Sequence, residues 1–187
     1  MDQDEARLRI LDAAEQLFYD RGIQAVGMDE LRTAAGVSLK RLYQCFPSKN
    51  DLVEEYLRRR DTRWRAALAE YITRHAATPQ DRPLALFDWL HTWFAAPGFR
   101  GCAFINSYGE LGPSSDGVAC VARDHKLALR EYVTDLVRDL PVGNPSGLAG
   151  QLVLLIDGAI TTAALTGEPA AARDARTAAE ALVAAAG

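Results

Sequence analysis

A short run of side chains near the N-terminus has the donor and acceptor chemistry that reads bases in a DNA duplex. Lys40 and Arg41 can donate to the acceptor atoms of guanine, and Gln44 can bond adenine through both ends of its amide. Leu39 offers an aliphatic contact for the thymine methyl group, and Tyr43 offers a hydroxyl for a phosphate oxygen. These residue types therefore predict a surface that contacts both the bases and the backbone of duplex DNA.

The charge distribution around this run supports the prediction, although the chain as a whole is acidic. The formal net charge is −4 at pH 7, which disfavours nucleic-acid binding over the entire surface. Between Leu31 and Asn50, however, there are four basic residues and no acidic residue. The four are Arg32, Lys40, Arg41 and Lys49. A small basic region within an acidic protein is typical of a local DNA-binding surface, and Lys49 suits a phosphate.

Two short helices joined by a tight turn would present these side chains. The sequence predicts helices over residues 28–35 and 39–46, with Gly36 ending the first and Ser38 capping the second. Leu42 and Phe46 lie one turn apart and would hold the second helix on the domain. The pattern is that of a helix-turn-helix, whose second helix enters the major groove. The side chains that this helix would expose are Leu39, Lys40, Arg41, Tyr43, Gln44 and Cys45.

Helical patterns cover most of the remaining chain. Apolar residues at helical spacing, with breaks at glycine, proline and serine, predict seven further helices. They cover residues 4–21, 48–76, 84–95, 102–111, 117–140, 147–166 and 170–186. Gly22 would end the first of them, Ser48 with Asp51 would form a capping box, and residues 78–83 would be a linker. The predicted fold is all-α, with about nine helices.

The last two predicted helices are the candidates for a subunit interface. Leu148–Gly167 is apolar around its whole circumference and has one charged residue, Asp157. A carboxylate in mid-segment disfavours a membrane span, so this helix is predicted to be buried on all sides by protein. Residues 170–186 add a stripe of small side chains that allows close helix packing. We predict a homodimer through residues 147–186, with the core of a monomer as the alternative, and Asp157 could face the interface, a ligand or solvent.

Aromatic residues are concentrated in the central part of the chain. Aromatic residues at helical spacing either fill a core or line an apolar pocket with a few polar groups. The candidate pocket residues for a small molecule are Trp64, Trp89, Trp93, Phe94, Cys102, Phe104, Asn106, Tyr108 and His125. Cys102 would begin a helix beside Arg100, where a thiolate is favoured, or it would be a small packing residue.

Other functional classes lack their motifs in this sequence. The chain has no glycine-rich phosphate loop, no nucleophile elbow and no zinc-protease helix motif. His75, His91 and His125 are far apart and have no cysteine partners at metal-binding spacing. We therefore predict no enzymatic activity, no cofactor and no metal. A charged N-terminus without an apolar signal segment, together with three cysteines, predicts a cytoplasmic protein that does not enter the membrane.

Residues 36–52, GVSLKRLYQCFPSKNDL, resemble the TetR (tetracycline-repressor-type) family of bacterial regulators. The resemblance is specific over about residues 6–56, and the rest of the chain is similar only in the number and order of helices. It implies DNA contacts from Ser38, Leu39, Lys40, Arg41, Tyr43, Gln44 and Lys49. Gly27 and Met28 would offer backbone amides to a phosphate, although the family often has Ser or Thr at the position of Gly27. Arg32 replaces a common alanine and would contact phosphate or simply lie on the surface.

The family resemblance also implies that two parts of the chain have different functions. Residues 1–47 would bind DNA, and residues 48–187 would bind an effector and dimerise, with the helix from residue 48 linking the two. The protein would be a repressor, associated with the nucleoid when bound, that a small-molecule effector releases from a palindromic operator. Residues 101–106 resemble a segment of a TetR subgroup in which some members sense electrophiles or oxidants, which would make Cys102 the sensing residue.

Overall fold

Ten helical segments account for the regular structure of residues 2–187, the part of the chain that the computed structural model describes. They are α1 (Gln3–Arg21), α2 (Met28–Ala35), α3 (Leu39–Cys45), α4 (Lys49–His75), the 3-10 helix η1 (Pro79–Asp81), α5 (Arg82–Phe94), α6 (Ala103–Leu111), α7 (Asp116–Arg138), α8 (Pro145–Thr166) and α9 (Ala171–Ala186). These residues contain no strand. The predicted all-α fold with about nine helices is confirmed.

The helix ends follow the capping signals in the sequence. Gly22 ends α1 with a φ of 85°, and its N–H donates to the carbonyl of Phe18 at 3.0 Å. At the start of α4, the N–H of Asp51 donates to Ser48 Oγ at 3.1 Å. The N–H of Ser48 donates in return to the Asp51 carboxylate at 2.9 Å, which confirms the predicted capping box. Such caps satisfy amides that a helix cannot pair internally.

The segment predicted as a linker is more regular than expected. The carboxylate of Asp81 accepts from the N–H of Thr78 at 3.0 Å and from its hydroxyl at 2.7 Å, and residues 79–81 form η1. The helix α5 then begins at Arg82 instead of residue 84. The prediction was wrong because the polar and proline residues that are common in loops are also those that begin helices.

The helices are gathered in two compact units, and each unit is built from two separate stretches of sequence. The first unit comprises the residues up to Thr62 and Ala103–Asp124. The second unit comprises Arg63–Cys102 and His125–Gly187. The helices α4 and α7 therefore contribute residues to both units. The functional division predicted at residues 47 and 48 is a separate matter and stays a prediction.

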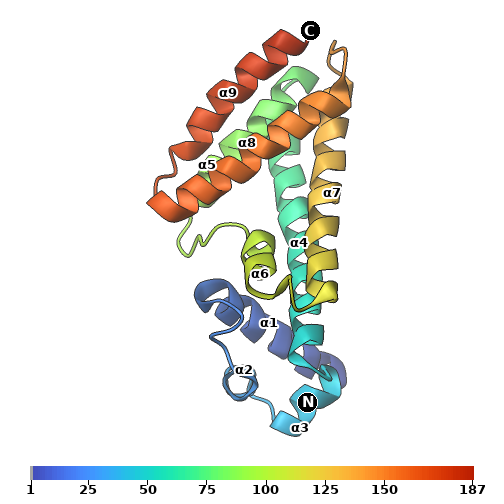
Figure 1. Ribbon diagram of the computed structural model, residues 1–187, viewed down its shortest axis with the longest axis vertical. Coiled ribbons are helices and arrows are strands. Elements are labelled where there is room, and N and C mark those ends of the chain that lie inside the picture. Colours follow the sequence, from blue (N-terminus) through green and yellow to red (C-terminus); the bar gives the residue numbers. More distant parts are fainter. Residues whose placement is uncertain (1) are drawn as a thin grey trace. The chain divides into compact units, whose positions relative to one another are not determined.

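The first unit is built around side chains from its N-terminal helices, where α1, α2 and α3 pack on one another (Figure 1). The fully buried side chains include Ile10 from α1, Leu31 from α2, Leu42 from α3 and Leu52 from α4. The rings of Phe18 and Tyr56 meet edge to face, with centroids 5.7 Å apart. This apolar core determines where the short helices α2 and α3 lie.

In the second unit, α5, α8 and α9 pack on one another (Figure 1). Ala172, Ala175 and Ala179 form the buried face of α9, and their small side chains allow close helix packing. On α8, by contrast, Leu154 and Leu165 are 74% and 82% exposed. A single chain therefore does not bury this helix on all sides, and its predicted burial in a homodimer stays a prediction.

Two further facts bear on α8. Its length and composition suit a membrane span, the one such helix in residues 2–187, and 39% of its most apolar window is buried within the chain. Asp157, whose role the sequence left open, forms an ion pair with Lys126 of α7 and is half-buried. The carboxylate thus has a partner within its own chain.

Candidate nucleic-acid interface

The turn between α2 and α3 has the backbone geometry of a helix-turn-helix. Gly36 ends α2 with φ 65° and ψ 36°, a left-handed conformation that favours glycine. The N–H of Val37 donates to the carbonyl of Arg32 at 3.0 Å, and the Val37 side chain is buried. Ser38 then caps α3, because its hydroxyl oxygen accepts from the N–H of Arg41 at 3.2 Å. The turn therefore sets the direction in which α3 leaves α2.

The inner face of α3 and its end is formed by Leu42, Cys45 and Phe46, all of which are buried. The predicted exposure of Cys45 is wrong, because residues three apart share one face of a helix and Cys45 follows Leu42 inward. Arg7 of α1 strengthens this contact by donating to the carbonyl of Cys45 at 3.0 Å. The guanidinium of Arg7 also lies 4.4 Å from the centroid of the Phe46 ring.

The outer face of α3 presents the predicted base-reading side chains to solvent. Leu39 and Tyr43 are 41% and 45% exposed, Lys40 and Gln44 are also exposed, and Arg41 is half-exposed. Within residues 2–187, the side chains of Lys40 and Arg41 have no acidic partner. Two positive charges are therefore available on a helix whose opposite face is anchored in the core.

The start of α2 lies beside this helix and has free donor capacity. Gly27 occupies the N-cap position and supplies no side-chain acceptor for the first amides of α2. Such amides, at the positive end of a helix dipole, suit a phosphate oxygen. Arg32 is engaged on the surface, where its Nε lies 2.6 Å from the carboxylate of Asp29.

Lys49 lies at the start of α4 and is bonded within the first unit. Its Nζ donates to the carbonyl of Ile23 at 2.6 Å and lies 5.8 Å from the centroid of the Phe18 ring. Burial lowers the pKa of Lys49 below its usual value, and the nearby carboxylate of Glu110 opposes part of that shift. The phosphate contact expected of Lys49 stays a prediction.

Ile23, which Lys49 contacts, lies in the turn between α1 and α2. Glu110 of α6 also forms hydrogen bonds with this turn. Its carboxylate accepts from the N–H of Ile23 at 3.0 Å and from the N–H of Gln24 at 2.8 Å. Its backbone carbonyl accepts from the Gln24 side-chain amide at 2.7 Å. These residues are more than 80 positions apart in the chain, so the sequence offers no local signal for the contact.

Comparison with known proteins shows where this helix-turn-helix arrangement occurs elsewhere. Residues 10–56, which contain the turn and both of its helices, match the family model described as bacterial regulatory proteins, tetR family. A TetR-family transcriptional regulator from Streptomyces coelicolor has the same fold, with a TM-score of 0.88 and 29% sequence identity. That similarity covers 98% of this chain and 96% of the other. Residues 10–56 are thus similar to the TetR family, and the whole chain shares the fold of a TetR-family regulator.

Two further relatives differ in how much of the chain they match. The transcriptional activator FasR of Mycolicibacterium smegmatis is 49% identical over 57 residues, which are 30% of this chain and 26% of FasR. The chain therefore matches about a quarter of the length of that relative. A TetR-type regulator from Streptomyces avermitilis is 29% identical over 97% of both chains, with a TM-score of 0.84. The long matches rest on shared structure more than on shared residues.

The residues predicted for an effector pocket fall into both units. Trp64, Trp89, Trp93 and His125 come together in the second unit, where the Trp64 ring centroid lies 5.0, 5.7 and 5.5 Å from the other three. Phe94 and Cys102 belong to the same unit and are buried. Phe104, Asn106 and Tyr108 belong to α6 in the first unit, and of these only Phe104 is buried. Effector binding by these nine residues stays a prediction.

Proposed function

We propose that this protein is a regulator of the TetR family that controls transcription by binding a near-palindromic DNA operator as a homodimer. The observation that carries the proposal is the pair of free cations, Lys40 and Arg41, on the outer face of an anchored helix. The major groove of B-DNA is about 12 Å wide and admits one α-helix. In that groove α3 would present donors to guanine acceptors, which vary with sequence and so allow one operator to be distinguished from others.

The proposed contacts divide into those that read bases and those that bind the backbone. Leu39, Lys40, Arg41 and Gln44 would contact base edges. Ser38, Tyr43, Arg32 and the amides of Gly27 and Met28 would contact phosphates, with Arg32 exchanging Asp29 for the nucleic acid. For Lys49 the bond to Ile23 favours a supporting role within the domain.

Homodimerisation would use the outer face of α8 together with α9. Leu154 and Leu165 are large apolar side chains that are exposed to solvent in a single chain. A two-fold interface would bury both residues in each subunit and would place two copies of α3 for two half-sites. In this proposal the protein is cytoplasmic, and the partner subunit, not a membrane, covers the apolar surface of α8.

The finer parts of the proposal concern control. A small, flat apolar effector is the chemistry that suits the tryptophan cluster around Trp64, where it would replace ring-to-ring contacts and release the operator. In this scheme the protein would repress transcription while it occupies the operator, and the effector would relieve that repression. Sensing through Cys102 would require its buried thiol to become accessible, so alkylation that leaves operator affinity unchanged would remove that idea.

Selection of bound sequences from a random duplex pool tests the proposal. The intact protein should enrich a near-palindrome, and the double variant Lys40→Ala/Arg41→Ala should lose this enrichment. The charge-matched control is Arg74→Ala/Arg138→Ala, which removes two exposed arginines that pair within their own helices. If the wild-type protein binds no duplex at low salt, the regulator assignment fails.

A further inference from the structure

The turn at residues 22–27, between α1 and α2, is bonded from two sides by side chains that lie far from it in sequence. The carboxylate of Glu110 accepts from two consecutive amides, those of Ile23 and Gln24. Lys49 donates to the carbonyl of Ile23, so both polar groups of that residue's backbone are held by ionisable side chains. Hydrogen bonds to charged groups are stronger than neutral ones, and this turn receives three of them.

The backbone approaches Glu110 closely because residue 22 is a glycine. A Cβ atom at Gly22 would lie 3.2 Å from a carboxylate oxygen of Glu110, and the φ of 85° is one that other residues rarely adopt. The contact of α6 with the turn is thus built into the backbone as well as into the side chains.

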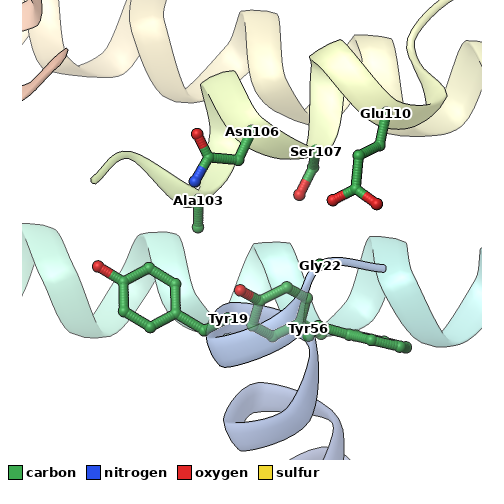
Figure 2. A pocket seen from close by; sticks show the side chains of 8 residues that line it. Tyr19, Gly22, Tyr56, Ala103, Asn106, Ser107 and Glu110 are labelled. Carbon is green, nitrogen blue, oxygen red and sulfur yellow. The ribbon is translucent and has the colours of Figure 1, made fainter. Parts of the chain in front are cut away.

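Apolar packing also holds the turn, because the side chains of Ile23 and Val26 are buried, but packing is incomplete beside α6. A cavity of about 220 Å³ lies between α6 on one side and α1 and α4 on the other. Figure 2 shows Asn106, Ser107 and Glu110 of α6 directed toward the rings of Tyr19 and Tyr56 across this space. Because protein atoms do not fill this space, the link between α6 and the turn relies on the hydrogen bonds of Glu110.

We propose that Glu110 is a positioning residue for DNA binding. Its carboxylate holds the turn, the turn sets the start of α2, and α2 supports the helix α3 that enters the groove. When the carboxylate is lost, the competent arrangement becomes a smaller fraction of the folded protein, and apparent operator affinity falls by that fraction. The inference rests on the proposed DNA-binding function and adds a residue that need not touch DNA.

The variant Glu110→Gln separates position from charge. Glutamine has nearly the same size, but its NH2 group cannot accept from a backbone amide, so either Ile23 or Gln24 loses its acceptor. The substitution also removes a negative charge, which by long-range electrostatics strengthens binding to a polyanion. A positioning role and a charge effect therefore predict changes of opposite sign.

The experiment compares Glu110→Gln with Glu131→Gln, an equal charge change at an exposed residue of α7. We expect Glu110→Gln to bind the selected operator about tenfold more weakly than Glu131→Gln, with the same salt dependence. By NMR hydrogen exchange, the amides of Ile23 and Gln24 should lose protection in Glu110→Gln alone. If Glu110→Gln fails to fold, Glu110→Asp is used, which keeps the charge but shortens the reach; it should weaken binding in the same direction.

Operator affinity in Glu110→Gln that equals or exceeds that of Glu131→Gln would overturn the inference. The inference would also be overturned if Glu110→Asp lost protection at the amides of Ile23 and Gln24 but kept its operator affinity. Failure of the wild-type protein to bind any duplex is a different result, because it removes the proposed function on which the inference rests.

Discussion

The two units of this protein place opposite chemistry on their exposed helix faces. In the first unit, α3 presents Lys40 and Arg41 to water while its other face is buried. In the second unit, α8 presents Leu154 and Leu165, and its charged residue Asp157 is paired with Lys126. The first surface suits a polyanion, and the second suits another apolar surface.

Sequence identity to relatives differs with the length of the match. Identity reaches 49% over the 57 residues shared with FasR, but only 29% over the nearly complete chain of the Streptomyces coelicolor regulator. A reading helix needs specific donors at specific positions, since hydrogen bonds to bases depend on geometry. Packed helices need only apolar residues of suitable size at helical spacing, so many sequences maintain them.

The largest expected effect concerns the apolar surface of the second unit. Leu154→Glu should dissociate the proposed dimer, because a two-fold interface contains each substitution twice. Burial of one leucine contributes about 1.5–3 kcal/mol, so the loss in dimerisation free energy is roughly 3–6 kcal/mol. Sedimentation equilibrium measures it, and Leu127→Glu on the exposed side of α7 is the control. A Leu154→Glu protein that remains dimeric would show that this surface serves another purpose.

The next effect concerns the anchor of α3 in the first unit. Leu42→Ala should lower the free energy of unfolding by about 2–5 kcal/mol, because Leu42 is fully buried and leaves a cavity. Leu39→Ala on the exposed face of the same helix should change it by less than about 0.5 kcal/mol. Urea denaturation followed by circular dichroism compares the pair. Similar losses in both variants would mean that α3 is not anchored on one face.

A smaller effect is expected for a single reading side chain. Arg41→Ala should weaken binding to the selected operator by about 1–3 kcal/mol and should change binding to random duplex much less. Fluorescence anisotropy with both duplexes at one salt concentration provides the measurement. Equal losses on the two duplexes would assign Arg41 to the backbone and leave base reading to its neighbours.

The smallest effect concerns the cap of α3. Ser38→Ala removes the acceptor for the N–H of Arg41 and should cost about 1 kcal/mol in the free energy of unfolding. Ser38→Gly, which retains the extended backbone of a cap position, should cost only a few tenths of a kcal/mol. Thermal denaturation of the two variants tests this order, and the reverse order would show that the hydroxyl does not stabilise the helix.

Much of the first unit could be predicted from sequence because its signals are local. Gly36, Ser38 and the capping box at Ser48 each act within a few residues, and the helices begin and end near the predicted positions. Predictions failed where one residue type is compatible with two structural environments. Proline and polar residues before α5 started a helix instead of a loop, and Cys45 faced the core instead of the groove.

The sequence by itself determined the helices, the turn between α2 and α3, and the basic side chains on the outer face of α3, because spacing of three or four residues sets a helix face. Only the tertiary structure decided that Glu110 and Lys49 bond the α1–α2 turn, that Arg7 supports the end of α3, and that Asp157 pairs with Lys126. These contacts join residues 26 to 87 positions apart. No local pattern specifies such pairs, since they exist only after packing has brought the helices together.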